Sequence, residues 1–533
     1  MLRFCLAAVA VLVATGDAGA QIVRGTVRDA ETGVALQGVF VMLLDSTTQM
    51  RGGVLTDANG FYAIRAARAG TYTLRAERIG QQSMASPPTV LTDSAATTVD
   101  LRLPVAAIQL APLHVSGANR CIARPRTGER AAQLWEEARK ALTVARWVER
   151  EKQFQFESRS YTRNLDPISL HIRREAVRHD VSRNMPYAAL DADSLVKYGF
   201  VRRDGESYVY YGPDAQTLLS DPFLDSHCFH SVDGTGDTRG MVGLAFRPVL
   251  DTKQPDIEGV LWLDAKTLEL RFIDYRYTNL ARPYRVRGTG GRTDFRMLSN
   301  GAWIVSRWYI RMPIVVASAM ERGEYRTTAM QEEGGEVLGI RSAALTLQLK
   351  RDGVVRGVVY DSVKGQPLAN AMVYLSGTAY HSRTDSVGRF QITGVPQGGY
   401  VIAFAHATVD SMPMLPEPAS VDVQPGDTSS VQLAVRPLQH QIAQRCGALY
   451  RDASTAVLFG KLTRSHGAAV TMATVTAEEV GYRTGDNGEY VLCGLPMNRA
   501  LNVVITDANG WVRRERVTIA EVPYRRLDIE LKE

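Results

Sequence analysis

The 533-residue sequence lacks several patterns that would indicate a membrane protein or a common type of enzyme. No run of 18 or more apolar residues follows residue 20, so we expect no membrane-spanning helix. None of the 9 histidines has a glutamate three residues later, so the H-x-x-E pair of a zinc peptidase is missing. H-E-x-x-H, G-x-S-x-G and P-loop motifs are missing as well. The sequence therefore predicts no enzyme, no metal site and no cofactor.

The first residues have the pattern of a secretory signal peptide, 1–20. Arg3 precedes the apolar run 4–14, and the small residues 18–20 predict cleavage before Gln21. A lipid-anchored protein would need cysteine at the cleavage site, where glutamine stands. We expect an exported protein of the periplasm, of the outer-membrane surface or of the extracellular space.

Cysteine is scarce, with 5 residues in the whole chain. Cys5 lies in the signal peptide, and its removal leaves Cys121, Cys228, Cys446 and Cys493. An even number in an oxidising compartment favours two disulfides, and sequence proximity favours Cys121–Cys228 and Cys446–Cys493. Four free thiols are the alternative.

A metal site is a second hypothesis for Cys228. The stretch DSHCFH places His227, Cys228 and His230 close together, and all three can bind a soft metal. Neighbours in a strand point to opposite faces, and no fourth ligand is identifiable. The disulfide is the favoured prediction.

Charge and composition set limits without naming a function. The formal net charge is +6, and no dense block of lysine and arginine occurs, so we expect no nucleic-acid partner. With 45% hydrophobic residues the chain can bury cores, and its length suggests three or four domains.

One nine-residue phrase occurs in three related forms. It reads TDANGFYAI at 56–64, TDSVGRFQI at 384–392 and TGDNGEYVL at 484–492. Each copy lies in a longer unit that predicts strand, polar turn, strand, D-x-x-G turn, strand, second turn and strand. The chain therefore contains three copies of one small β unit.

The phrase has the chemistry of a turn. An aspartate can accept backbone N–H groups that follow it, and a glycine can adopt the positive φ that such a turn requires. The residues predicted to form these turns are Asp57, Gly60, Asp385, Gly388 and Gly488. The third copy has Gly485 in place of the aspartate, with Asp486 one step later.

The aromatic residue of the phrase is expected to start the next strand. In the first copy Phe61 directly follows the glycine, whereas Phe390 and Tyr490 stand two positions after it. This offset predicts that the first copy departs in register from the other two.

The pattern G-x-V-x-D…T-G-x-x-L-x-x-A-x-V…T-D-x-x-G-x-F…G-x-Y resembles the carboxypeptidase regulatory-like domain. The resemblance covers 22–104 and 354–434 and extends more weakly to 457–531. It implies a small β-sandwich of transthyretin-like type. The residues that carry over are turn formers, and the resemblance implies no catalytic residue.

The region 129–350 has a different pattern. It opens on ERAAQLWEEARKALTVARWVERE, where apolar residues recur at helical spacing and Glu136 lies four residues before Lys140. The apolar positions are Leu134, Ala138, Ala141, Ala145 and Val148. Strand-like segments rich in aromatic residues follow. We expect a long antiparallel sheet curved over an amphipathic helix.

Part of this region, GVLWLDAKTLELRFIDYRY, loosely resembles the W-x-D-x-x-T-x-x-L strand pair of the periplasmic lipoprotein-carrier half-barrel. That resemblance implies a concave apolar sheet that holds acyl chains. The predicted apolar ligand surface consists of Trp262, Phe272, Trp303 and Trp308. The alternative is an ordinary sheet whose aromatic side chains form its own core.

The predicted fold class is mainly β, with three small transthyretin-like or immunoglobulin-like β-sandwiches flanking one α+β domain. The expected parts are a signal peptide 1–20, a sandwich 21–104, a linker 105–128, the α+β domain 129–350, a sandwich 354–434, a linker 435–456 and a sandwich 457–533.

Two functions fit this organisation. The first is a non-catalytic cell-envelope protein whose sandwiches bind envelope proteins or glycans through loops and edges. The second is a carrier that holds a lipid or another apolar ligand in the middle domain. A cavity among the four rings named above would favour the carrier. A hydrolase with an unrecognised site is a third hypothesis, which perturbed carboxylates in a cleft would favour.

Overall fold

A computed structural model describes most of the chain after the predicted signal peptide. The described residues are 21–92, 96–104, 129–187, 189–205, 207–249, 254–317, 325–342, 346–349, 352–410, 416, 418–451, 454–485, 487–507 and 510–531. The predicted signal peptide, the predicted linker 105–128 and Cys121 lie outside the described residues. Unit 1 comprises Met1–Arg163 and Ala176–Leu349, and unit 2 comprises Asn164–Glu175 and Lys350–Glu533.

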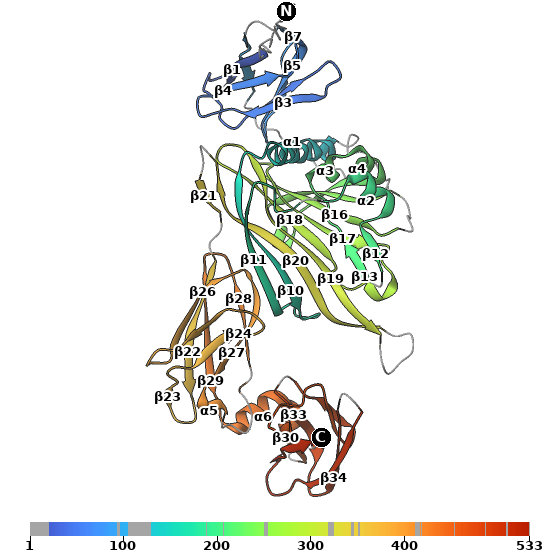
Figure 1. Ribbon diagram of the computed structural model, residues 1–533, viewed down its shortest axis with the longest axis vertical. Coiled ribbons are helices and arrows are strands. Elements are labelled where there is room, and N and C mark those ends of the chain that lie inside the picture. The colour runs from blue at the N-terminus through green and yellow to red at the C-terminus, as the bar shows by residue number, and fades with distance from the viewer. Residues whose placement is uncertain are drawn as a thin grey trace, which may run out of the picture. The chain divides into compact units, whose positions relative to one another are not determined.

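The first sandwich lies in unit 1 and consists of two sheets (Figure 1). One sheet contains β1 (Gln21–Asp29), β4 (Phe61–Ala66), β8 (Thr97–Thr98) and β9 (Leu101–Leu103). The other contains β2 (Phe40–Leu44), β3 (Met50–Leu55), β5 (Gly70–Glu77), β6 (Met84–Ala85) and β7 (Thr89–Leu91). Alternate residues of β1 are buried, as expected for a strand with one face in a core.

A long antiparallel sheet and one long helix follow in unit 1 (Figure 1). The strand order is β14-β15-β16-β17-β18-β19-β20-β10-β11. The elements are α1 (Glu129–Glu151), β10 (Gln155–Leu165), β11 (Ile172–Ser182), α2 (Ala192–Tyr198), β12 (Val201–Asp204), β13 (Ser207–Tyr210), α3 (Ala215–Leu219), α4 (Asp221–Ser226), β14 (His227–Asp233), β15 (Met241–Pro248), β16 (Asp256–Asp264), β17 (Leu270–Thr278), β18 (Gly290–Met297), β19 (Trp303–Ala317), β20 (Tyr325–Arg341) and β21 (Thr346–Gln348). The predicted fold class is confirmed.

The predicted apolar face of α1 is buried. Its members Leu134, Ala138, Ala141, Ala145 and Val148 all belong to the core cluster that includes the inward side chains of the long sheet. The helix forms because these positions recur every three or four residues, so that a single stripe meets the sheet.

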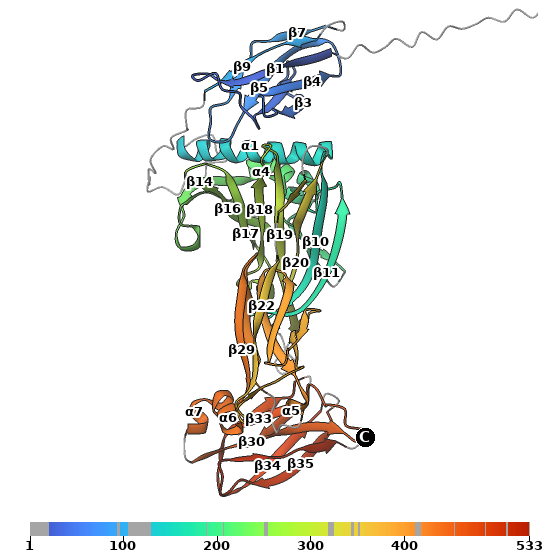
Figure 2. The same ribbon diagram turned by 90° about the vertical axis from the view of Figure 1, so that its left-hand side faces the viewer.

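The opposite side of α1 is also covered, by the first sandwich (Figure 2). Trp147 packs against Phe40, with ring centroids 5.2 Å apart. Lys140 Nζ donates to Glu137 at 2.6 Å and to the carbonyl of Gln81 at 2.6 Å. Burial raises the pKa of the Glu137 carboxyl, although the Lys140 ammonium opposes this shift. The sandwich is therefore docked on the helix.

Ion pairs on α1 differ from the four-residue pairing that the sequence indicates. Glu136 pairs with Arg139 at 2.7 Å and with Arg75 of the first sandwich at 3.2 Å. Lys140 pairs with Glu137 instead. The contact with the first sandwich decides the pairing, because the buried Glu137 and Lys140 need partners within the interface and Arg75 of the sandwich reaches Glu136.

Unit 2 contains the second sandwich. One sheet consists of β22 (Gly353–Asp361), β23 (Gln366–Pro367), β26 (Arg389–Val395) and β29 (Thr428–Val435). The strands opposite are β24 (Met372–Leu375), β25 (His381–Arg383), β27 (Gly398–Ala405) and β28 (Ala419–Val423), and α5 (Ala407–Asp410) follows β27.

The third sandwich also lies in unit 2. One sheet consists of β30 (Thr455–Arg464), β33 (Glu489–Pro496), β36 (Tyr524–Arg526) and β37 (Ile529–Leu531). The other consists of β31 (Thr474–Ala477), β32 (Val480–Arg483), β34 (Ala500–Thr506) and β35 (Val512–Thr518). The segment before it, predicted as a linker, holds two helices, α6 (Leu438–Cys446) and α7 (Ala448–Arg451).

The three sandwiches share one arrangement at their centre. Each sandwich has a glycine in the middle of a strand: Gly25, Gly357 and Gly460. At all three positions, an added Cβ would lie 1.9 Å from the carbonyl oxygen of a residue in a neighbouring segment. These acceptors belong to Val99, Val431 and Leu527. Glycine is required there because no side chain fits between the two backbones.

An aromatic ring lies beside each of these glycines, and it corrects the predicted offset. The rings are Tyr62, Phe390 and Tyr490, all buried and all two positions after the turn glycine. Phe61 is 43% exposed and points to the other face. The first copy is therefore in register with the others, because strand alternation and not ring type decides which residue faces the core.

The turns of the repeated phrase are alike in the first two copies. Oδ1 of Asp57 accepts two backbone N–H groups at 2.9 Å, and Oδ1 of Asp385 accepts two at 3.0 and 2.8 Å. The three turn glycines have φ between 72° and 74°. In the third copy the Oδ1 atom of Asn487 accepts the N–H of Glu489 at 3.2 Å.

Gly485→Asp is expected to stabilise the third sandwich by about 1 kcal/mol, because it restricts the unfolded chain and restores the acceptor that the other copies have. Gly485 does not have a positive φ, and a Cβ there would meet only Asn487 Oδ1, at 3.8 Å. Thermal unfolding and hydrogen exchange of β30 and β33 measure the effect. Gly485→Ala is the matched control, with an expected gain of roughly 0.5 kcal/mol. Equal stability of the two variants would contradict the role of the carboxylate.

Candidate functional site

The sheet that contains the repeated phrase has one face in the sandwich core and one face outside it. In the second sandwich, alternate residues of β22, β26 and β29 point outward because the strand period is two. The outward residues at the centre of this face are Arg356, Val358, Arg389, Gln391, Ser430 and Gln432.

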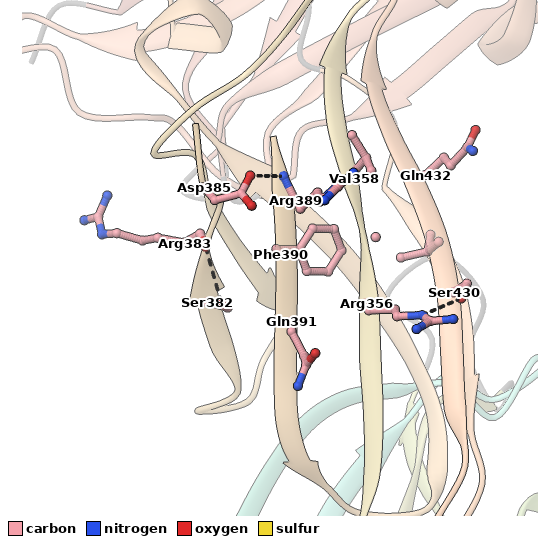
Figure 3. A pocket seen from close by; sticks show the side chains of 12 residues that line it. Arg356, Val358, Ser382, Arg383, Asp385, Arg389, Phe390, Gln391, Ser430 and Gln432 are labelled. Atoms are coloured by element: carbon pink, nitrogen blue, oxygen red, sulfur yellow. Dashed lines mark hydrogen bonds between the residues drawn. The ribbon is translucent and has the colours of Figure 1, made fainter. Parts of the chain in front are cut away.

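These residues line a surface groove of about 780 Å³ (Figure 3). Ser382 and Arg383 of β25, with Asp385 of the turn, border it on the side of β26. The volume lies within the range of ligand sites in proteins, roughly 300–1,000 Å³. We name this surface the second-sandwich groove.

The second-sandwich groove carries a surplus of positive charge. Three arginines and one aspartate line it, and Oδ1 of Asp385 already accepts the backbone N–H of Arg389 at 2.8 Å. Arg356 donates to Ser430 at 3.4 Å, and Arg383 donates to the side chain of Asn370 at 3.1 Å. Within the described part of the chain, the guanidinium of Arg389 has no hydrogen-bond partner. It is therefore the cation of the groove that is most available to a ligand.

The corresponding face of the third sandwich is covered. Ile442 and Cys446 of α6 pack on Phe459 and Val491, which occupy the outward positions of β30 and β33. A disulfide joins Cys446 to Cys493 on the same strand, which confirms that predicted pair.

The charge at the centre of this face is reversed between the two copies. Glu489 occupies the position of Arg389, directly after the turn glycine. Its carboxylate lies 3.7 Å from Arg445 of α6 and 3.7 Å from Lys461 of β30. A helix with a basic residue therefore covers the copy that has an acidic residue there.

The corresponding face of the first sandwich differs again. Phe61 and Ala63 stand where the second copy has Arg389 and Gln391, and both are exposed. At these two positions the three copies thus differ: the first has exposed apolar residues, the second has Arg389 and Gln391, and the third has Glu489 and Val491 beside α6.

The edge strands explain why the groove floor is continuous in the second copy. In the first copy, the hydroxyl of Tyr62 donates to the carbonyl of Val99 at 2.5 Å, and the side chain of Asp100 accepts the N–H of Thr26 at 2.8 Å. These side-chain hydrogen bonds take the place of backbone pairing, so the strand beside β1 is interrupted between β8 and β9. The hydroxyl of Thr26 also donates to Asp100, at 2.9 Å, and the two hydrogen bonds from Thr26 lower the pKa of the Asp100 carboxyl. The third copy repeats this with Tyr490, whose hydroxyl donates to Leu527.

The second copy has neither of the groups that interrupt the edge. Phe390 lacks the hydroxyl, and Gln432 stands where the first copy has its aspartate. β29 consequently pairs with β22 without interruption from Thr428 to Val435. The outward side chains of β22 and β29 then lie side by side and form a continuous part of the groove floor.

The four rings of the predicted apolar ligand surface lie in two groups. Trp303 belongs to the core cluster on α1, and Trp308 packs against that cluster and against Tyr187, with ring centroids 4.9 Å apart. Trp262 and Phe272 face each other across β16 and β17, outside this cluster, with ring centroids 6.5 Å apart. The structure does not bring the four rings together, and the ligand surface stays a prediction.

The DSHCFH stretch places its side chains in different environments. The ring of His227 is buried and accepts or donates at Phe223, Ser226 and Ile257. Cys228 is disulfide-bonded, and His230 is exposed. Across the described ranges, no group of three or more His, Cys, Asp or Glu side chains could hold a metal ion.

The groove could not be found from the sequence motif alone. Its key position is the residue directly after the turn glycine, which reads Phe61, Arg389 and Glu489 in the three copies. The variation was visible in the repeated phrase. Whether this position faces outward depends on strand alternation, and the register predicted for the first copy was wrong.

No helix in the described part of the chain has the length and apolar character needed to cross a membrane.

Two sheets and the aspartate–glycine turn of the repeated phrase define a small β-sandwich module. A comparison with protein families identifies this module in the first and second sandwiches. The model of the carboxypeptidase regulatory-like domain matches residues 22–104 and 354–436. The chain therefore contains two carboxypeptidase regulatory-like domains. The match does not reach the third sandwich, whose structure shares the central glycine, ring and carbonyl with the other two.

No curated protein matches the chain. The solved TIE protein of Bacillus anthracis is 14% identical, with a TM-score of 0.16 and coverage of 62% of this chain and 64% of that one. This chain thus spans less than two thirds of that protein's length.

Two pilins give similar values. GBS52, the minor pilin of Streptococcus agalactiae, is 12% identical, with a TM-score of 0.13 and coverage of 34% of this chain and 96% of that one. BcpA, the major pilin subunit of Bacillus cereus, is 10% identical, with a TM-score of 0.13 and coverage of 78% and 98%. TM-scores this low carry no information about a shared function.

Proposed function

We propose that the chain is an exported, non-catalytic protein of the cell envelope that binds a partner protein through the second-sandwich groove. The observation that carries this proposal is the relation between the second and third sandwiches. In the third, the same face holds a helix of the chain itself, and Glu489 lies opposite Arg445 of that helix. The second copy is open and has Arg389 at that position.

The positive charge of the second-sandwich groove favours a negatively charged partner. An occupant with acidic side chains would pair with Arg389 and Arg356, as the basic residue of α6 pairs with the acidic one of the third copy. Gln391, Gln432 and Ser430 supply further donors and acceptors for backbone groups. We expect an acidic protein segment as the occupant, with an acidic polysaccharide as the other outcome to test.

Export is part of the proposal, on the basis of the signal-peptide pattern and of the disulfide between Cys446 and Cys493. The lack of a recognisable catalytic motif agrees with a binding role.

Arg389→Glu is expected to weaken binding of poly-L-glutamate to the purified mature chain about tenfold, equivalent to roughly 1.4 kcal/mol. The reason is that the central cation of the groove becomes a like charge. Isothermal titration calorimetry at low and at 0.5 M salt measures the affinity, since a surface charge pair weakens with salt. Lys364→Glu makes the same charge change on an exposed turn outside the groove and is the control.

Each probe separates one outcome. Binding of alginate but not of poly-L-glutamate would replace the protein partner by an acidic polysaccharide. Equal binding of poly-L-lysine and poly-L-glutamate would contradict charge selection, and equal loss in both variants would contradict the groove as the site.

A further inference from the structure

A second cavity lies in unit 1, where the first sandwich meets α1. It has a volume of about 620 Å³ and is lined by strands β2 and β3, by one side of α1 and by the end of α3. This cavity shares no residue with the second-sandwich groove. We name it the helix cleft.

The floor of the helix cleft is apolar. Met42, Leu44 and Met50 come from the first sandwich, Trp147 from α1 and Leu219 from α3. Met42 and Trp147 are buried, and the other three are half-buried. Half-buried apolar side chains around a cavity of this size can cover the hydrocarbon part of a ligand.

The rim of the helix cleft is basic. Arg139, Thr143, Arg146 and Arg150 follow one another at intervals of four, three and four residues, so they lie on one face of α1. Arg75 of the first sandwich lines the cleft from the other side. No acidic residue lines it.

Acidic residues lie behind this rim and limit the number of free charges. Glu77 and Glu136 pair with both Arg75 and Arg139, and Glu151 pairs with Arg150. These ion pairs neutralise the charges of Arg75 and Arg139 and hold the first sandwich on α1, so these two arginines are less available to a ligand.

Arg146 differs from the other arginines of the rim. It is exposed and forms no salt bridge with any described residue. The pKa of Glu149 is raised by burial and by Asp214, and the charge of Arg146 opposes that rise. Because Arg146 is exposed and no salt bridge holds its guanidinium, it can pair with an incoming anion.

We infer that the helix cleft binds a single-chain amphiphilic anion, such as a long-chain carboxylate. The apolar floor takes the hydrocarbon chain, and the carboxylate pairs with Arg146 and with Arg150, which exchanges its exposed contact with Glu151 for the ligand. A neutral amphiphile would lack this pairing, and a cationic one would be repelled. The site is distinct from the predicted apolar ligand surface, because none of its four rings lines the helix cleft.

The test uses cis-parinaric acid, a fluorescent long-chain carboxylate, with the full mature chain. We expect saturable binding, at least a fivefold weaker Kd for Arg146→Glu, and an equal or larger loss for Met50→Asp, which places a charge on the floor. Arg65→Glu makes the same charge change on an exposed strand of the first sandwich and should bind like the wild type. Thermal unfolding checks that each variant is folded.

Competition separates the remaining outcomes. Palmitate should displace the probe, and hexadecyltrimethylammonium should not. Equal displacement by both would show that the apolar floor alone binds and would overturn the role of the arginines. Unchanged affinity in Arg146→Glu and Met50→Asp would overturn the site itself.

Discussion

Gly460→Ala is expected to unfold the third sandwich locally, with hydrogen-exchange protection of β30 and β33 reduced by at least about a hundredfold, equivalent to roughly 3 kcal/mol. A Cβ at this position would lie 1.9 Å from the carbonyl oxygen of Leu527 and 2.6 Å from its carbon. Both are backbone atoms, so no side-chain rotation can relieve the overlap.

The strands around this glycine leave little room for adjustment. β30 pairs with β36 before Leu527 and with β37 after it, so the backbone that would have to move is held on both sides. The hydroxyl of Tyr490 donates to the same carbonyl and fixes it further. Extra atoms in a packed core commonly cost about 1–3 kcal/mol, and a backbone collision belongs at the upper end of that range.

Hydrogen exchange measured by mass spectrometry on the full mature chain separates this effect from the other domains, where global unfolding would not. Gly485→Ala is the matched control, since its Cβ would meet only one atom, at 3.8 Å. Gly25→Ala and Gly357→Ala should affect their own sandwiches in the same way, because the distance to the carbonyl is again 1.9 Å. Protection within tenfold of the wild type would contradict the steric explanation.

Removal of the disulfide between Cys446 and Cys493 is expected to lower the free energy of unfolding of the third sandwich, with α6 docked on it, by roughly 4 kcal/mol. The two residues are 47 positions apart, and the chain-entropy model gives this value for a loop of that length. The lost constraint should release α6 and expose Phe459 and Val491, which it covers. Faster hydrogen exchange in α6 and β33 would report the change.

Cysteine-to-alanine variants provide the control. Cys493→Ala and the double variant Cys446→Ala/Cys493→Ala both lack the bond and should therefore behave alike, and reduction of the wild type should give the same result. A much larger effect in the double variant than in Cys493→Ala would instead assign the loss to packing of the buried Cys446 side chain.

A free face on the third sandwich would also bear on the proposed function. With α6 released, the exposed Glu489 should bind a basic polymer such as poly-L-lysine, the reverse of the preference expected for the second sandwich.

Local patterns were sufficient for much of the architecture. The 23 residues of α1 carry a helical stripe and fold as that helix, because burial of one stripe against a sheet stabilises it. The turns at Asp57 and Asp385 follow from the local hydrogen bonds of aspartate and the φ of glycine. Such features depend on neighbours a few residues away, so they can be read directly.

Structural features that depend on residues far apart in the sequence were either not predicted or predicted wrongly. Tyr62 and not Phe61 faces the core, because β4 is placed by its pairing with β1. The segment predicted as a linker holds α6, because Phe459 and Val491 far along the chain offer an apolar surface for it. Glu137 and Lys140 are buried together because the first sandwich docks on the polar side of α1.

The sequence by itself determined the mainly β class, the repeated sandwich unit, its turns, the helix α1 and the bonded pair Cys446–Cys493. The tertiary structure decided which face of each copy is open, covered or docked, and it placed Arg389 in a groove and Glu489 under a helix. The physical reason is that turns and helical stripes are properties of short segments. The exposure of a sheet face depends on which other part of the chain packs against it, and no local pattern contains that information.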